Sequence, residues 1–148
     1  MKAFLQISGV RGNSSDPYHN GWIELARLDL VPGSNTRRPR GAGTAWVPPI
    51  ALNCAAVTGP FALALKVAAD TGGSFTSAML DVVGGRRGAA VATARVRMQR
   101  LHLSAFEAVD DPGLLRPYLK FTLVSEDHRF ERGVVLDLSL PHEAVHAS

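Results

Sequence analysis

The chain has 148 residues, the length of a single domain (residues 1–148), and it can bury a core without a disulfide or a metal. Apolar and charged residues occur in the proportions of a soluble globular domain, which excludes a disordered chain, and no apolar run approaches the roughly 18 residues of a membrane span. The net charge is +3, and the single cysteine, Cys54, excludes an internal disulfide and an all-thiolate zinc site.

Basic residues gather in arginine clusters at residues 37–40, 86–87 and 95–100. Aromatic residues do not interleave with these arginines as they would in a stacking platform for bases, and acidic residues offset most of the charge. We therefore expect no nucleic-acid ligand. The first seven residues lack the long apolar core of a signal peptide, so we also expect no Sec-type export.

The N-terminal half reads as strands and loops. Residues 2–7 alternate between apolar and polar positions, which predicts a strand, and residues 8–20 predict a loop. A second strand at 22–31 changes its apolar face near Ala26, which is typical of a bulge or of a strand that passes between two sheets. Residues 32–43 predict an extended loop, and the strand at 44–55 should lie at an edge or break at Pro48-Pro49.

One helix is predicted at residues 59–70. Thr58 is the expected N-cap, and Gly72 or Gly73 is the expected left-handed stop. The helix is apolar on nearly all sides, with Lys66 and Asp70 as its charged residues. Such a helix must be covered on more than one side, which in a small domain indicates a second chain.

The rest of the sequence returns to strands. We expect a strand at 75–82, a hairpin turn at 84–88, a long strand at 90–109 that changes face after Met98, and a turn at 110–113. A last hairpin is predicted from residues 118–125 and 129–140 around Glu126-Asp127-His128. Six to eight strands with one helix make the chain mainly antiparallel β.

No segment makes a convincing catalytic site. Residues 142–146 match H-E-x-x-H, but they lie in a segment, 141–148, that we expect to be flexible, so we predict no zinc site. Cys54 is expected to be a small buried apolar residue, and the glycine-rich segments 9–12 and 84–88 are expected to be turns. His102 and His128 are isolated and predicted to be structural or solvated. We expect no enzyme activity, no cofactor and no metal.

Residues 7–25 carry a more specific pattern. A strand is followed by a Gly-x-x-Gly turn, a serine and an aspartate, a histidine, and then Trp-Ile-Glu with an aliphatic residue. These elements are Gly9, Gly12, Ser14, Asp16, His19, Trp22, Ile23, Glu24 and Leu25. The segment resembles the N-terminal signature of the Hcp family, the tube proteins of type VI secretion systems. The helix and the Asp70-Thr71-Gly72-Gly73 segment after it resemble the same family.

The resemblance implies a fold and an assembly. The expected fold is a small antiparallel β-barrel of two sheets with one flanking helix, and six copies would close into a ring that stacks into a hollow tube. Gly9, Asp16, His19, Trp22 and Glu24 would then be structural motif residues.

The resemblance also implies contact residues within that assembly. The helix would face the neighbouring subunit through Phe61, Leu63, Leu65 and Lys66. The loop residues Arg37, Arg38 and Arg40 would reach acids such as Asp110 and Asp111 on the next ring, and Arg95 and Arg97 would line the lumen.

The implied function is mechanical. A contractile sheath would drive the stacked rings outward, a spike protein would cap them, and small effectors would travel in the lumen. The subunit would be cytoplasmic before assembly and secreted afterwards, without membrane insertion. Two alternatives stay open: a tail-tube protein of a phage or other contractile particle, and a monomeric barrel that binds a small ligand inside.

Overall fold

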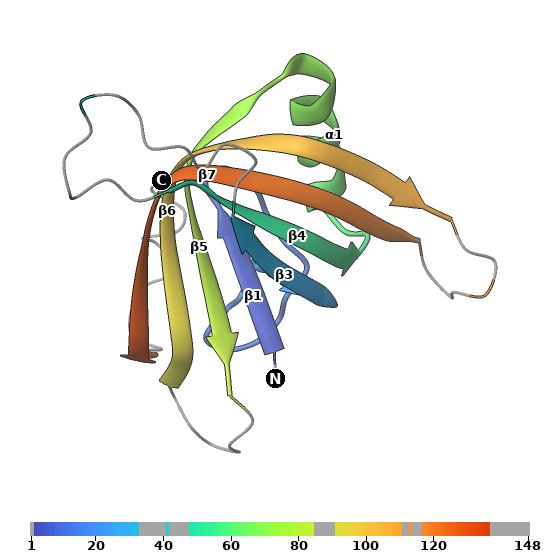
Figure 1. Ribbon diagram of the computed structural model, residues 1–148. Coiled ribbons are helices and arrows are strands. Elements are labelled where there is room, and N and C mark those ends of the chain that lie inside the picture. The colour runs from blue at the N-terminus through green and yellow to red at the C-terminus, as the bar shows by residue number, and fades with distance from the viewer. Residues whose placement is uncertain are drawn as a thin grey trace.

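The computed structural model describes residues 2–32, 41, 48–84, 91–110, 113 and 117–136, and within them it contains seven strands and one helix. The elements in chain order are β1 (Lys2–Ile7), β2 (Ile23–Leu25), β3 (Arg27–Pro32), β4 (Ile50–Val57), α1 (Phe61–Thr71), β5 (Ser74–Val83), β6 (Val91–Val109) and β7 (Tyr118–Val135). The mainly β class with one helix is therefore confirmed. Figure 1 shows α1 on the flank of the strands.

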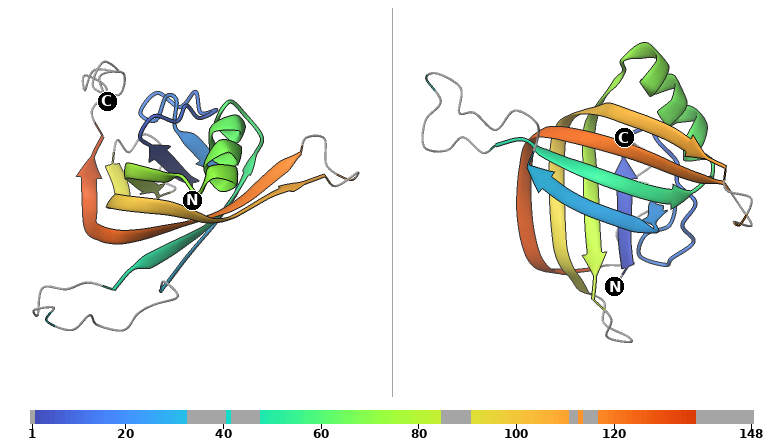
Figure 2. Two further views of the ribbon diagram at one scale, coloured as in Figure 1. Left: turned by 90° about the horizontal axis from the view of Figure 1, so that it is seen from above. Right: turned by 45° about the vertical axis from the view of Figure 1, so that its right-hand side comes forward.

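All seven strands belong to one antiparallel sheet, in the order β2-β1-β5-β6-β7-β4-β3. The expectation of two separate sheets is thus corrected to a single sheet that curves strongly, as the two views of Figure 2 show. The long strands β6 and β7 make this possible because they run through both halves of the curved sheet and keep them hydrogen-bonded.

The change of face near Ala26 has a clear structural cause. β2 pairs with β1 at one end of the sheet, whereas β3 pairs with β4 at the other end. Ala26 alone separates the two strands, and its N–H donates to the carbonyl of Ala55 at 2.7 Å. Of the two predicted causes, a bulge or a passage between two sheets, the structure favours a passage, which here joins the two ends of one curved sheet that does not close into a barrel.

The concave side of the sheet is filled by aliphatic and aromatic side chains. They come from both halves of the sheet and from α1, and the large ones with no exposed surface are Leu5, Leu52, Phe61, Leu65, Leu80 and Leu123. Their burial supplies the main favourable free energy of folding, at roughly 1.5–3 kcal/mol for each side chain. Because this interior is packed, it is a core rather than a ligand cavity.

The helix begins later than expected. It covers Phe61–Thr71 with Pro60 at the N-cap, and no side chain caps it. Thr58 was the predicted cap, but its N–H donates to the carbonyl of Pro117 at 3.0 Å, which holds the residue outside the helix. The predicted stop is confirmed at Gly72, which has φ 66°.

Two alternatives were expected for the strand around Pro48-Pro49, an edge position or a break. The edge position is wrong, since β4 lies inside the sheet between β7 and β3, and the structure agrees with the break. β4 begins at Ile50, directly after Pro48-Pro49, because neither proline has a backbone N–H to donate to a ladder. Residues 44–47, the start of the predicted strand, lie outside the described residues.

The predicted hairpin around Glu126-Asp127-His128 is wrong, since β7 runs through these residues without a turn. Opposite them, β6 changes face at Arg100, which has φ 54°, and the ladder continues with Gln99 paired to Asp127. The hydroxyl of Ser125 donates to the carbonyls of Gln99 and Asp127 at 3.2 and 2.7 Å. The polar triplet marks the point where β7 leaves β4 and its side chains become exposed, and not a turn.

Candidate functional site

The motif segment forms a compact loop that folds back on β1 and β2. The N–H groups of Gly12 and Ser14 donate to the carbonyls of Gly21 and Trp22 at 2.7 and 2.8 Å. A Cβ on Gly12 would overlap the backbone of Trp22, so only glycine permits this approach. Gly9 makes the turn after β1 with φ 78°.

The loop places the side chain of His19 in the interior, against Phe4 of β1. The imidazole is 1% exposed and stacks on Phe4, with ring centroids 4.2 Å apart, and the edge of Trp22 packs against it at 4.7 Å. The carboxylate of Asp16 accepts a hydrogen bond from the N–H of Tyr18 at 3.1 Å, which forms a turn. Phe4 is therefore buried although the alternation in β1 places it opposite Leu5, because this loop covers the second face of the sheet there.

His19 lies between two carboxylates. Its Nδ1 is 2.8 Å from Oδ2 of Asp16, and its Nε2 is 2.8 Å from Oδ2 of Asp81. Asp81 has no exposed surface, and Arg95 binds it with both Nε and a terminal nitrogen, at 2.6 and 2.8 Å. Asp81 and Arg95 are directly opposite each other in the β5–β6 ladder, so the sheet register fixes this pair.

Hydrogen bonds set the electrostatics of Asp81. An ionised carboxylate only accepts hydrogen bonds, and Arg95 donates one to each oxygen of Asp81. Burial raises the pKa of Asp81, but hydrogen bonds from Arg95 and His19 outweigh burial and hold its pKa below the ordinary value. The hydrogen bond to Asp81 raises the pKa of Arg95. The buried carboxylate of Asp81 is thus paired with the guanidinium of Arg95.

This network holds structure together rather than supplying reactive groups. Because both nitrogens of His19 are engaged by carboxylates, the ring has no free position to take a proton from a substrate. Cys54 lies elsewhere, buried in β4, where burial raises the pKa of its thiol. It behaves as the small apolar residue that the sequence predicts.

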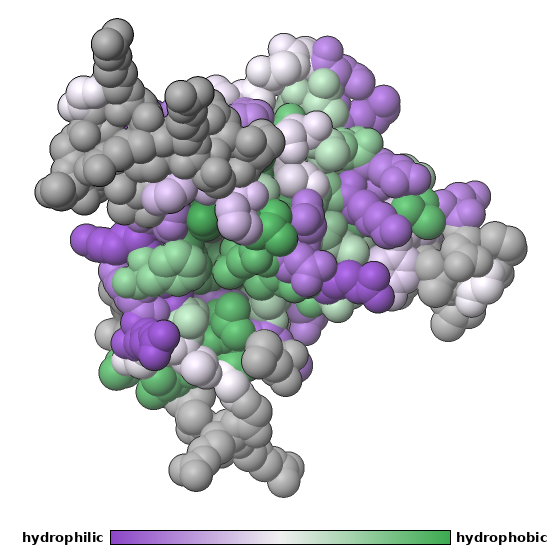
Figure 3. Space-filling view, in the orientation of Figure 1, coloured by the Kyte–Doolittle hydropathy of each residue, from purple (hydrophilic) through white to green (hydrophobic). Residues whose placement is uncertain are grey.

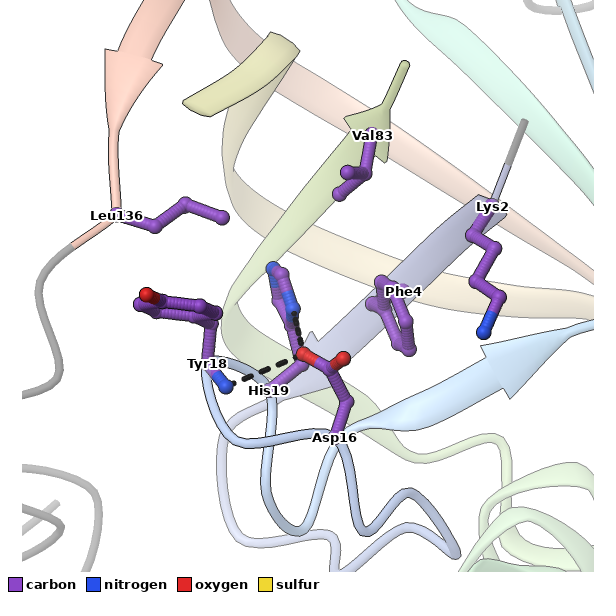
Figure 4. A pocket seen from close by; sticks show the side chains of 7 residues that line it. All are labelled: Lys2, Phe4, Asp16, Tyr18, His19, Val83 and Leu136. Atoms are coloured by element: carbon purple, nitrogen blue, oxygen red, sulfur yellow. Dashed lines mark hydrogen bonds and ion pairs between the residues drawn. The ribbon is translucent and has the colours of Figure 1, made fainter. Parts of the chain in front are cut away.

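A cavity of about 210 Å³ lies beside the network (Figure 4). The figure shows Asp16, Tyr18 and His19 together on one loop, with Val83 and Leu136 across from them. Its residues are Lys2, Phe4, Asp16, Tyr18, His19, Val83 and Leu136. Of its polar groups, Asp16 binds His19 and the N–H of Tyr18, whereas Lys2 pairs with Glu24 outside the lining.

The predicted interface residues on the helix divide into two groups. Phe61 and Leu65 have no exposed surface and belong to the core of the chain, so they cannot contact a neighbour as expected. Leu63 is 71% exposed, and the side chain of Lys66 is 64% exposed and pairs with Asp70 at 3.3 Å. Of these four residues, only Leu63 and Lys66 are exposed enough to contact another copy.

The two arginines predicted to line a lumen also differ. Arg95 is held by Asp81 and its side chain is 13% exposed, so it is a structural residue of the network. Arg97 is 43% exposed and pairs with Glu131 at 2.9 Å. Glu24, a predicted motif residue, is exposed, and its Oε1 lies 3.9 Å from Nζ of Lys2.

Several predicted residues lie outside the described part of the chain. These are Arg37, Arg38, Arg40, Asp111, the turn residues 85–88 and the H-E-x-x-H segment at 142–146. Asp110 is described and exposed. Within the described ranges, no group of three or more His, Cys, Asp or Glu residues is arranged to hold a metal ion, and no helix there is long and apolar enough to cross a membrane.

The fold of this chain is similar to that of several solved structures. No protein-family model matches the chain, and no curated protein matches it in sequence. Among solved structures, Hcp1 from Salmonella typhimurium is similar with a TM-score of 0.71 and 15% identity, covering 88% of this chain and 86% of that protein. A protein described as a type six secretion system protein is similar with a TM-score of 0.69 and 18% identity, covering 88% and 83%.

A more distant similarity extends to a protein of the anti-feeding prophage. The tube-terminating cap of the anti-feeding prophage has a TM-score of 0.53 and 6% identity, covering 88% of both chains. The chain therefore has the fold of Hcp tube proteins, as the motif at residues 7–25 indicated.

Proposed function

We propose that this chain is a structural subunit of a type VI secretion tube, in which six copies form a ring and rings stack into a hollow tube. The observation that carries the proposal is the similarity to Hcp1 over 88% of the chain. The Gly9–Glu24 motif supports it, because its residues build the buried network that holds this fold together.

The surface of the chain supports self-assembly. Leu63 and Val67 are 71% and 51% exposed on one face of α1, an apolar face that an isolated subunit would leave in water. Figure 3 also shows hydrophobic residues gathered over the middle of one face of the molecule, between hydrophilic residues on either side. Contacts that repeat from copy to copy would bury such surfaces.

In this assembly each remaining candidate residue has a place. Leu63 and Lys66 face the neighbouring subunit, Arg97 lines the lumen, and Arg37, Arg38 and Arg40 reach Asp110 and Asp111 of the adjacent ring. The function is mechanical, so the chain performs no catalysis. A contractile sheath, a spike protein and small effectors are its partners, and it passes from the cytoplasm to the exterior with the tube.

The mass in solution tests the proposal. Light scattering after size exclusion should give about 95 kDa, which is six copies of the 15.8 kDa chain, and negative-stain images of the same peak should show rings. Leu63→Lys should lower the fraction of rings, whereas Thr71→Lys at the exposed end of α1 should not. A monomer at all concentrations would refute the proposal.

A tail-tube protein of another contractile particle is the second candidate, and the similarity to the anti-feeding prophage cap favours it. Both candidates predict rings, so mass does not separate them. The genes next to this one can separate the two candidates, because they should encode the other parts of the same assembly.

A further inference from the structure

A second hollow, of about 240 Å³, lies on the surface where β5 and β6 run side by side. Four polar side chains line it, Ser74 and Thr76 from β5 and Arg100 and His102 from β6. The ladder pairs Ser74 with His102, and the same register places Thr76 opposite Arg100. Because opposite residues of a ladder have Cβ atoms about 5 Å apart, these side chains are close enough to bind one small ligand. We call this site the β5–β6 hollow.

Arg100 owes its place in the hollow to an uncommon backbone conformation. Its φ is 54°, in the left-handed region that residues other than glycine seldom adopt. Regular alternation would place Arg100 on the same face as Met98, which is buried. Instead, Leu101 is the next buried residue of β6, and Arg100 is exposed together with His102. Residues in such conformations are concentrated at ligand sites. The conformation turns the guanidinium out of the core and into the hollow.

The guanidinium of Arg100 is held loosely by two acids. Its Nε lies 3.9 Å from Oε2 of Glu126, and a terminal nitrogen lies 3.9 Å from Oδ2 of Asp127. These distances exceed the roughly 2.7–2.9 Å of a charge-assisted hydrogen bond, so the guanidinium keeps N–H groups for a ligand. Glu126 also lines the hollow, and its negative charge offsets that of Arg100. An anion with a single charge therefore suits the hollow better than one with two.

The other donors of the hollow also have few partners. Within the described residues, the hydroxyl of Ser74 and the imidazole of His102 form no side-chain hydrogen bond. The hydroxyl of Thr76 lies 2.9 Å from that of Ser8, and the hydroxyl that accepts in this pair keeps its own hydrogen to donate. A carboxylate only accepts hydrogen bonds, so it matches a set of free donors.

The floor of the hollow is apolar. Leu101 is 1% exposed, and Phe75, its partner in the ladder, is half-buried and packs against the core. Both residues line the hollow beneath the polar side chains. Its volume is below the roughly 300–1,000 Å³ of pockets for drug-sized ligands, so a small molecule fits it. An organic anion would place its charged group on the donors and its hydrocarbon part on Phe75.

We propose that the β5–β6 hollow binds a small organic carboxylate, whose carboxylate group is held by the four polar side chains and whose apolar part lies on Phe75. The site goes beyond the proposed function, because a single chain supplies every group in it. Binding therefore requires no assembly. Two paired strands carry the site, so its groups are positioned before the ligand arrives.

Saturation-transfer NMR tests the site with benzoate as the probe. Benzoate should bind saturably, and benzyl alcohol, which has the same ring without the charge, should bind about tenfold more weakly or less. Inorganic phosphate at the same concentration should displace little of the benzoate. No transfer to benzoate would overturn the proposal, and equal binding of benzyl alcohol would show that the carboxylate is not recognised. Full displacement by phosphate would overturn the ligand class.

Three substitutions locate the bound probe. Arg100→Gly should weaken benzoate binding about tenfold or more yet fold normally, because φ 54° suits glycine. Arg129→Gly is the matched control, since Arg129 is an exposed arginine of β7 that pairs with Glu131 outside the hollow. Glu126→Gln should tighten binding about threefold, because it removes the opposing charge.

Circular dichroism checks the fold of each variant, and light scattering checks its mass. Unchanged benzoate binding in folded Arg100→Gly would overturn the assignment of the site. Weaker binding in Glu126→Gln would contradict an anionic ligand. Since the mass of Arg100→Gly should equal that of the wild type, a failure of the site is distinguished from a failure of the ring.

Discussion

Removing the charge of Asp81 is the most informative perturbation of the buried network. Asp81→Asn keeps the shape of the side chain but leaves His19 with Asp16 and Arg95 with the weaker attraction of Glu131. Breaking a buried ion pair by removing one partner costs about 3–5 kcal/mol, a large fraction of the roughly 5–15 kcal/mol that stabilises a typical domain. Asp81 has no exposed surface, so water cannot replace the lost charge.

Urea denaturation followed by circular dichroism measures this loss. With a slope of about 2 kcal/mol per molar urea, the midpoint should fall by about 2 M. Asp70→Asn is the matched control, because Asp70 forms an exposed pair with Lys66 and its loss should cost less than about 0.5 kcal/mol. If Asp81→Asn lowers the midpoint no more than Asp70→Asn does, the network is not a source of stability and our account of the motif fails.

Three further predictions concern acid, the close approach in the motif loop, and the thiol. Because the folded-state pKa of Asp81 lies below its ordinary value of 3.8, its stabilising effect is present above that pH and is lost as pH falls through the folded-state pKa. The difference between wild type and Asp81→Asn in urea titrations should therefore shrink below about pH 4. Gly12→Ala should destabilise the chain by about 1–3 kcal/mol, because its Cβ overlaps the backbone of Trp22, and Ser15→Ala should be neutral in the same assay. Cys54 should resist a thiol reagent at pH 8 in the folded protein and react after unfolding, and rapid labelling of the native chain would contradict its burial.

Local patterns in the sequence predicted the elements whose causes are local. The alternation in β1, the left-handed stop at Gly72 and the change of face at Ala26 each depend on a few adjacent residues, and the structure agrees with all three. The turn at residues 126–128 was wrong because polar residues mark both turns and exposed strand edges. Only the neighbouring strand, which the sequence pattern does not identify, distinguishes these cases.

The buried network depends on contacts between distant residues. His19 was recognised as a motif residue, but its partner Asp81 lies 62 positions away on β5, and Arg95 was assigned to a lumen. One signal was present in the sequence, since Asp81 interrupts an apolar run between Leu80 and Val82. A charged residue in a strand centre requires a partner, but the register of β5 and β6 is needed to name it.

The backbone at Ala26 joins β2 directly to β3, and we call this covalent link between the two ends of the sheet the seam. β2 and β3 occupy the two ends of the strand order but follow each other in the chain, so the curved sheet cannot unroll at this seam by simply separating two edges. Opening it requires the loss of either the β1–β2 or the β3–β4 hydrogen bonds, together with the contacts that hold the seam to β4. Under force along the strands, the two halves should therefore yield as one cooperative unit rather than one after the other.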